Sequence, residues 1–203
     1  MPGQHTLTAD WLRQRFPLDP ARAPIHEPPL RTGEPVPAAV LVPIILRSSG
    51  LTVLLTQRTA HLRDHAGQVS FPGGRCEAHD PTPIATALRE SEEEVGIEPS
   101  QVEVLGTLPD YFTGTGFRIT PVIGLVSPPL NLRLDDFEVA EVFEPPLAFF
   151  LDQANYRSEV LEYAGSQRSY WAVPWEGYFI WGATAGMLVT LRESLCWWPN
   201  EGV

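Results

Sequence analysis

Apolar positions along the chain gather into short runs, and most of these runs have the length of a strand. Residues 38–46 (AAVLVPIIL) and 51–57 (LTVLLTQ) are almost continuously apolar and are joined by a Ser-Ser-Gly turn. Runs of this length without polar alternation are typical of strands that are buried on both faces. Further strands are predicted at residues 102–108, 118–126, 138–143, 157–163 and 169–173, and the last two form a hairpin around Gly165-Ser166.

Three segments have the end signals or the composition of helices. Thr8 can cap a short N-terminal helix, and Pro145 and Pro146 open another one that runs to Leu151. Residues 180–195 (IWGATAGMLVTLRESL) are apolar around much of a helical circumference and predict a closing helix. Between the first helix and the first strand, residues 17–37 contain seven prolines, which predicts an extended arm; a disordered linker is the alternative.

The most concentrated polar pattern lies on a fourth helix, which follows a glycine turn and an acidic loop. At about 100° per residue, Glu90, Glu93 and Glu94 share one face of this helix. Ile84, Leu88 and Val95 gather on roughly the opposite face, which we therefore expect to be the core side. The glutamate face is then expected to be exposed.

Glutamates at this spacing repel one another, so the cluster costs stability unless a cation offsets it. Ligand sets made only of oxygen suit a hard divalent ion such as Mg²⁺ or Mn²⁺. A solvated acidic helix face is the alternative. Glu92 points about 140° away from the middle of the cluster and is expected to be solvated.

Length and charge restrict the remaining possibilities. A chain of 203 residues favours one domain, expected at residues 38–203, with the helix and arm of residues 1–37 packed on it. The net charge of −11 argues against nucleic-acid and membrane partners, and no apolar run reaches the roughly 18 residues of a membrane span. Two cysteines and the lack of a signal peptide favour a reduced cytoplasmic setting.

A sequence motif gives the acidic helix a context. Gly74 and residues 89–97 (RESEEEVGI) resemble the signature of the Nudix hydrolases, with Ser91 at a position that is usually apolar. The signature has a glutamate six residues after its first glycine, where this chain has Asp80. Eight residues instead of seven then separate Asp80 from the arginine of the motif. Glu77 is the other acidic candidate, so the identity of the loop carboxylate stays open.

A second pattern resembles one subfamily, the coenzyme A pyrophosphatases. It comprises residues 54–58 (LLTQR), Arg63, Gly67 and the FPGG sequence of residues 71–74, with Thr59 at a position that is usually Ser or Ala. Residues 180–185 (IWGATA) also resemble a C-terminal segment of that subfamily. The resemblance implies an α/β fold, the Nudix-type α/β/α sandwich with a central mixed sheet.

The resemblance also implies roles for individual residues. Glu90, Glu93 and Glu94 would bind Mg²⁺ or Mn²⁺, and Glu93 could also be the general base. Arg89 would orient the loop carboxylate beside the catalytic glutamates. The substrate-binding candidates are Gly73, Gly74, Arg58 and Arg63.

Coenzyme A has a 3′-phosphate that simpler nucleoside diphosphates lack. Arg58 and Arg63 belong to the subfamily pattern, and at least one of them could bind this phosphate through charge-assisted hydrogen bonds. Pairing with surface carboxylates is the alternative for both arginines.

The implied activity is metal-dependent hydrolysis of the pyrophosphate bond of coenzyme A or a derivative, giving 3′,5′-ADP and 4′-phosphopantetheine. The alternatives are a Nudix hydrolase for another nucleoside diphosphate, such as ADP-ribose or a dinucleotide, and a non-catalytic binding module. The expected partner is a small-molecule substrate, and the chain could act as a homodimer.

Overall fold

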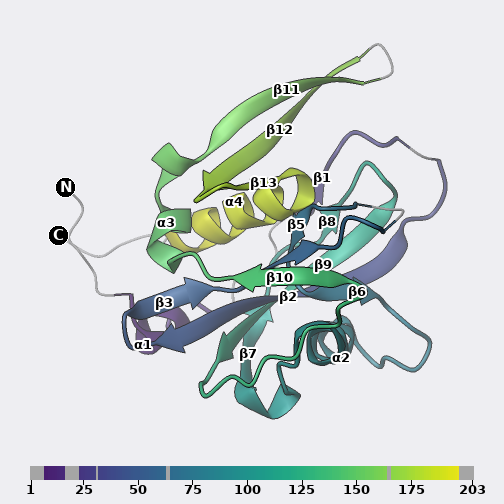
Figure 1. Ribbon diagram of the computed structural model, residues 1–203. Coiled ribbons are helices and arrows are strands. Elements are labelled where there is room, and N and C mark those ends of the chain that lie inside the picture. Colours follow the sequence, from purple (N-terminus) through teal and green to yellow (C-terminus); the bar gives the residue numbers. More distant parts are fainter. Residues whose placement is uncertain (1–6, 17–22, 31, 63–64, 164–165, 197–203) are drawn as a thin grey trace.

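The computed structural model describes residues 7–16, 23–30, 32–62, 65–163 and 166–196 (Figure 1). Its centre is a mixed sheet of seven strands in the order β1-β8-β9-β2-β3, with β6 on β2 and β7 on β9. The strands are β1 (Ile25–His26), β2 (Val36–Arg47), β3 (Gly50–Val53), β6 (Gly73–Arg75), β7 (Val102–Thr107), β8 (Tyr111–Phe112) and β9 (Phe117–Val126). The pairs β2–β9 and β1–β8 are parallel, whereas the other pairs in this sheet are antiparallel.

Two sheets of three strands flank the large one. The first has the order β10-β4-β5, and the second has the order β11-β12-β13. Their strands are β4 (Leu55–Arg58), β5 (Val69–Ser70), β10 (Val139–Phe143), β11 (Arg157–Tyr163), β12 (Ser166–Trp175) and β13 (Tyr178–Trp181). The β11–β12 hairpin extends away from the body of the molecule (Figure 1).

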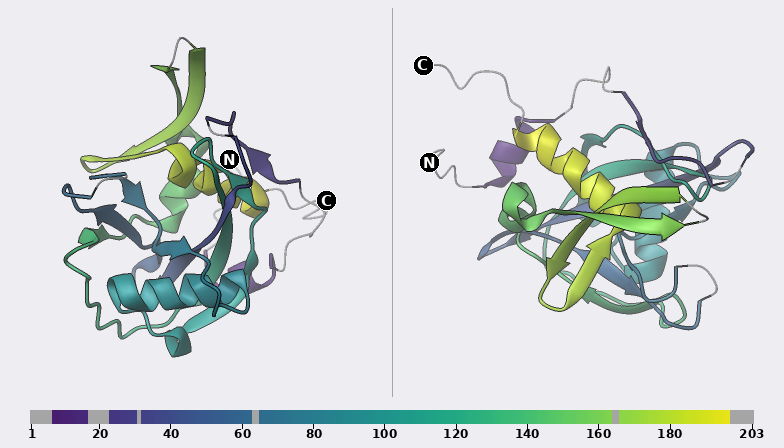
Figure 2. Two further views of the ribbon diagram at one scale, coloured as in Figure 1. Left: turned by 90° about the vertical axis from the view of Figure 1, so that its right-hand side faces the viewer. Right: turned by 90° about the horizontal axis from the view of Figure 1, so that it is seen from above.

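Helices cover both faces of the large sheet, with α2 on one side and α4 on the other (Figures 1 and 2). The helices are α1 (Ala9–Arg13), α2 (Pro83–Val95), α3 (Leu147–Leu151) and α4 (Gly182–Cys196), with short 3₁₀ turns at Pro99–Gln101 and Gln153–Asn155. Successive residues of β2 point to opposite faces, so Val42 and Ile44 enter the core under α4 while Leu41 and Ile45 enter the core under α2. The predicted α/β/α sandwich with a mixed sheet is confirmed.

Most predicted elements are present in the described residues. Thr8 caps α1, with its Oγ1 accepting a hydrogen bond of 3.1 Å from the backbone nitrogen of Trp11. The strands predicted near β2, β7, β9, β10, β11 and β12 all form, and α3 follows the proline pair. The predicted hairpin turn falls partly on residues 164–165, which lie outside the described residues.

The apolar run of residues 51–57 is not one strand, as the sequence suggested, but two. The chain leaves the large sheet at Leu54, whose backbone nitrogen donates to the carbonyl oxygen of Pro43 at 3.0 Å. Residues before Leu54 pair with β2, and those after it pair with β5 and β10. An apolar run has no signal for such a change of sheet, because its residues are buried on both sides of the break.

The closing helix was also predicted two residues too long at its start. Ile180 and Trp181 belong to β13 and pair with Val173 and Ala172 of β12. The helix begins at Gly182, which has a φ of 60°. Periodicity does not distinguish a buried strand from the first turn of a buried helix, and this explains the error.

The described part of the N-terminal arm contacts the loop that follows β8. Both oxygens of the Glu27 carboxylate accept hydrogen bonds there, one from the hydroxyl of Tyr111 at 2.8 Å and one from the backbone nitrogen of Gly114 at 2.7 Å. His26 stacks on Phe112 with ring centroids 4.3 Å apart. None of the helices in the described ranges is both long and apolar enough to cross a membrane.

Candidate active site

The acidic helix α2 has defined signals at both ends. Thr82 caps its start, with Oγ1 accepting from the backbone nitrogen of Ala85 at 3.2 Å, and Pro83 occupies the first turn. Gly96 ends the helix with a φ of 74°, a conformation that glycine adopts without steric cost. The loop between β9 and β10 satisfies two of the last carbonyl groups, because the backbone nitrogens of Arg133 and Asp135 donate to those of Val95 and Glu94 at 3.0 and 2.9 Å.

The expectation that the glutamate face is exposed is wrong for Glu94. Glu94 is only 6 % exposed, and its Oε2 accepts a hydrogen bond of 3.2 Å from the backbone nitrogen of Gly73. The side chain of Glu93 is 60 % exposed and Glu92 is exposed, both as expected, whereas the side chain of Glu90 is only 17 % exposed. The glutamates are thus separated by their surroundings: Glu94 faces the glycine turn, whereas Glu92 and Glu93 face solvent.

The core side of α2 is close to the prediction. Val95 is buried, and Ile84 and Leu88 are half-buried against the smaller core. Ala87 and Ser91 are also fully buried, and the Ser91 hydroxyl donates to the carbonyl oxygen of Ala87 at 2.6 Å. A serine therefore occupies the usual apolar position of the motif without leaving a buried hydroxyl unpaired.

The glycine turn brings β6 into direct contact with two glutamates. A Cβ atom added to Gly74 would lie 2.5 Å from the carboxyl carbon of Glu90, so the lack of a side chain creates the space for this carboxylate. Gly73 has a φ of 154° and packs against the backbone of Ala39 and Val40. Both predicted glycines therefore lie at the site, beside Glu90 and Glu94.

Arg89 connects the helix to the acidic loop. Its Nε and Nη2 donate to the two carboxylate oxygens of Asp80 at 3.1 and 2.9 Å. Its Nη1 lies 2.9 Å from Glu90 Oε1 and 2.9 Å from Glu93 Oε2, and Nη2 also reaches the carbonyl oxygen of Arg75 at 3.4 Å. One guanidinium thus links the loop, the glycine strand and two glutamates.

Asp80, and not Glu77, is the loop carboxylate that meets Arg89. The side chain of Asp80 is 4 % exposed, and it also accepts hydrogen bonds from the backbone nitrogen of Glu77 and the hydroxyl of Thr86. The bonds from Arg89 hold the pKa of Asp80 well below its usual range. Glu77 is 56 % exposed and lies beside His79.

The carboxylates near the glycine turn carry more negative charge than the protein around them offsets. Burial raises the pKa of Glu94 to about 8, the charges of Glu138 and Glu90 add to this rise, and the Gly73 hydrogen bond and the Arg58 cation oppose it. Burial also raises the pKa of Glu90. Buried oxygen donors with this excess of negative charge fit a hard divalent cation.

The described residues do not form a complete metal cage. No group of three His, Cys, Asp or Glu side chains in the described ranges is already arranged around a common point. Glu93 bonds Arg89, while Glu94 faces Gly73. Glu90 and Glu94, one helical turn apart, are the pair whose burial and chemistry fit a metal ion.

Sequence reasoning missed Glu138. This residue precedes β10, and its charge acts on both Glu90 and Glu94. The loop bonded to the end of α2 leads directly into Glu138, whose backbone nitrogen donates to the carbonyl oxygen of Asp135 at 3.0 Å. Its place at the head of a predicted strand was the one available signal, because the pairing of β10 with β4 is a tertiary contact.

Of the two candidate arginines, the structure describes only Arg58. Arg58 ends β4, and its Nη2 lies 3.6 Å from Glu138 Oε2, so it is placed beside the acidic cluster. Arg63 lies outside the described residues.

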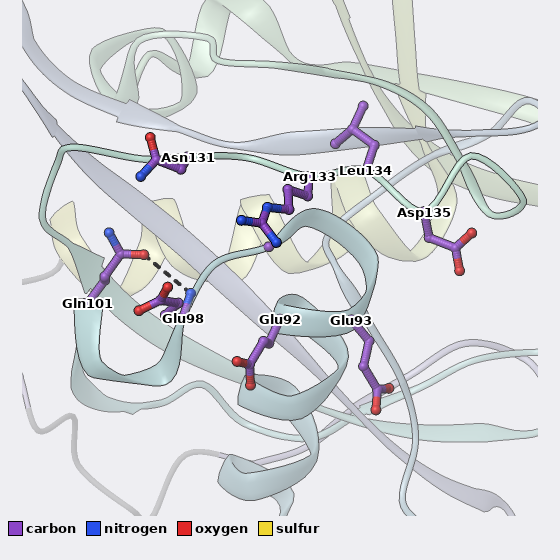
Figure 3. Close-up of a pocket in the computed structure, with 9 residues that line it drawn as sticks. Glu92, Glu93, Glu98, Gln101, Asn131, Arg133, Leu134 and Asp135 are labelled. Carbon is purple, nitrogen blue, oxygen red and sulfur yellow. Dashed lines mark hydrogen bonds between the residues drawn. The ribbon is translucent and has the colours of Figure 1, made fainter.

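A hollow of about 460 Å³ lies at the C-terminal end of α2 (Figure 3). It is lined by Glu92, Glu93, Gly96, Glu98, Gln101, Asn131, Arg133, Leu134 and Asp135. Four carboxylates and the negative end of the helix dipole disfavour an anion there. The hollow is therefore a poor site for a phosphate group.

Comparisons of the sequence with protein families and with curated proteins identify the same family. The NUDIX domain family matches residues 35–162. Proteins from Shigella flexneri serotype 5b (strain 8401) and Escherichia coli (strain K12), both described as uncharacterized Nudix hydrolase NudL, are 46 % identical over 191 residues. These matches cover 94 % of this chain and 96 % of each relative.

A solved structure supports the same architecture. The Nudix hydrolase RenU from M. Smegmatis superposes with a TM-score of 0.55, covering 85 % of this chain and 93 % of RenU. At 22 % sequence identity, this likeness shows the fold alone.

Proposed function

Because the chain belongs to the Nudix hydrolase family, we propose that it is a metal-dependent diphosphatase that hydrolyses the pyrophosphate bond of coenzyme A or its derivatives. The observation that carries this proposal is the seating of the Glu90 and Glu94 carboxylates against the Gly73-Gly74 turn. A module that only bound a ligand would have no use for buried, mutually repelling carboxylates, which cost stability.

Each residue of the site has a role in this reaction. Glu90 and Glu94 hold Mg²⁺ or Mn²⁺, which supplies charge neutralisation of the phosphate oxygens and an activated water. Arg89 positions Glu90 through an ion pair and Glu93 through a hydrogen bond, and it links both to Asp80. Glu93 is the most exposed of these glutamates and can take a proton from water or bind metal.

The proposed reaction is the hydrolysis of a pyrophosphate bond. A water oxygen forms a bond to one phosphorus of the pyrophosphate, the bridging P–O bond breaks, and the water proton is released. Coenzyme A is thereby divided into 3′,5′-ADP and 4′-phosphopantetheine, and an acyl derivative gives the corresponding acyl-phosphopantetheine.

The choice of coenzyme A rests on the subfamily pattern of residues 54–74. The second candidate is another nucleoside diphosphate, such as ADP-ribose or a dinucleotide. It is favoured by the position of Arg58, which lies beside the acidic cluster and not at a separate phosphate site.

A hydrolysis screen distinguishes these substrates. The full chain is incubated with coenzyme A, ADP-ribose and a diadenosine polyphosphate, with Mg²⁺ or with a chelator, and the products are identified by mass spectrometry. We expect metal-dependent release of 3′,5′-ADP from coenzyme A at a higher kcat/KM than for the other two compounds. Preferred cleavage of ADP-ribose or of the dinucleotide would replace the coenzyme A proposal with the second candidate.

A further inference from the structure

The site contains two arginines that differ in how many of their hydrogen-bond donors are already used. Arg89 has five N–H groups, and five acceptor contacts engage them: both oxygens of Asp80, one oxygen each of Glu90 and Glu93, and the Arg75 carbonyl. Arg89 therefore has no donor left for a substrate, and its role is to position other side chains.

Arg58 has the opposite arrangement. Its Nε is buried and has no hydrogen-bond partner among the described residues. Its contact with Glu138, from Nη2 to Oε2, is 3.6 Å, which is longer than a hydrogen bond. The side chain is 24 % exposed, so a small anion can reach it. A guanidinium with unused donors is a natural receptor for phosphate, which it can bind with two parallel hydrogen bonds.

The backbone of Arg58 is fixed on two sides. Its nitrogen donates to the carbonyl oxygen of Gln68 at 2.9 Å, and the residue pairs with Val139 of β10. The Glu138 carboxylate, one residue before Val139, lies beside the guanidinium. The backbone that carries the cation is thus held between two strands of the β10-β4-β5 sheet.

That place is next to the proposed reaction centre. The turn that leads to Glu138 begins at Asp135, whose backbone nitrogen donates to the carbonyl oxygen of Glu94 at 2.9 Å, and Glu138 Oε2 lies 3.6 Å from Arg58 Nη2. The Glu94 carboxylate in turn accepts from the backbone nitrogen of Gly73. A diphosphate that binds a metal ion held by Glu90 and Glu94 would therefore lie near Arg58. In coenzyme A the 3′-phosphate and the pyrophosphate are attached to different ribose carbons, so the group at this position is the pyrophosphate.

We propose that Arg58 binds the diphosphate group that is cleaved, and does not select for the 3′-phosphate. This inference rests on the proposed function, because it assumes that a diphosphate enters the site. Arg58 then acts on every diphosphate substrate alike. It also supplies local positive charge in a chain whose net charge of −11 repels such substrates.

The test compares Arg58→Gln and Arg58→Lys with the wild-type protein. The matched control is Arg157→Gln, which removes the same charge from an exposed side chain on β11, in a sheet that supplies no residue to the site. The kcat/KM is measured with Mg²⁺ for coenzyme A, 3′-dephospho-coenzyme A and ADP-ribose. Binding of inorganic pyrophosphate in the presence of Mg²⁺ is measured separately by calorimetry.

We expect Arg58→Gln to lower kcat/KM by about 10- to 100-fold, and by the same factor for each compound that the wild type cleaves. The pyrophosphate Kd should rise by a similar factor. Arg58→Lys should recover only part of the loss, because lysine keeps the charge but not the planar pair of donors. Arg157→Gln should stay within about twofold of wild type, as expected for a side chain outside the site.

A loss confined to coenzyme A, with 3′-dephospho-coenzyme A unaffected, would overturn the proposal in favour of a 3′-phosphate contact. Unchanged kcat/KM in Arg58→Gln would overturn it as well. Should Arg58→Gln fail to fold, unaltered pyrophosphate binding by Arg58→Lys would be the contradicting result. A wild type that cleaves none of the compounds would refute the proposed function, and the pyrophosphate Kd of the Arg58 variants would still decide the role of Arg58.

Discussion

Single residues on the same turn of α2 have very different surroundings. Glu92 is exposed, Glu93 is held by Arg89, and Glu94 is buried against Gly73. The helical phase of these residues could be read from the sequence, and it correctly placed Glu92 in solvent. Their burial could not, because it depends on β6 and Glu138, which only the tertiary fold brings to the helix.

The buried charge of Glu94 predicts a pH dependence of stability in the metal-free protein. Its pKa is about 8 in the folded chain, above the usual carboxyl value of 4.5, so its contribution to stability is complete below about pH 4.5 and is lost as the pH rises through 8. The free energy of unfolding measured with denaturant and a chelator should fall by about 4 kcal/mol between pH 5 and 9.

Glu94→Gln provides the comparison, because glutamine has nearly the same shape and does not titrate in this range. This variant should lose most of the decline in stability, and at pH 9 it should be more stable than the wild type without metal. An equally steep decline in both proteins would show that Glu94 is not the group responsible.

Glu92 gives a second test at this scale. Its side chain lies in solvent, away from the glycine turn, so Glu92→Gln should leave kcat/KM within about threefold of wild type. Steady-state kinetics at saturating Mg²⁺ measures this directly. A loss as large as that caused by changing Glu94 would mean that Glu92 takes part in the reaction.

Among the elements, the acidic loop and α2 are joined by the Asp80–Arg89 pair. Asp80→Asn removes the charge that holds the guanidinium, which frees Arg89 to move towards Glu90 and Glu93. We expect a kcat at least about tenfold lower and a lower midpoint of thermal unfolding. Glu77→Gln, in the same loop but exposed, is the matched control and should change neither quantity. Equal effects of the two variants would refute the assignment of Asp80 as the loop carboxylate.

The elements themselves could be predicted where one local signal decided them. The Thr8 cap of α1, the proline pair before α3 and the long apolar run of β2 are such cases. The predicted element boundaries were wrong where a single apolar run belongs to two elements, as at Leu54 and at Gly182. In both places the neighbouring strand in space, and not the local pattern, decides where one element ends.

Across the whole molecule, the site lies where two of the sheets meet one helix. The large sheet supplies the glycine turn through β6, and α2 supplies the glutamates. The β10-β4-β5 sheet supplies Arg58 through β4 and brings Glu138 close through β10. The motif resemblance predicted the glycine turn, the glutamates and Arg58 as site residues. The contact of Arg58 with Glu138 required the fold, because about 80 residues separate the two in the sequence.

The measurement that tests this account most directly is magnesium-dependent release of 3′,5′-ADP from coenzyme A by the wild-type chain and by Glu94→Gln, side by side. The wild type should release equal amounts of 3′,5′-ADP and 4′-phosphopantetheine, and only when Mg²⁺ is present. Glu94→Gln should be slower by about a hundredfold or more while remaining folded, since it removes one proposed ligand of the metal. Full activity of Glu94→Gln at saturating Mg²⁺, or a wild type that leaves coenzyme A intact, would contradict the account.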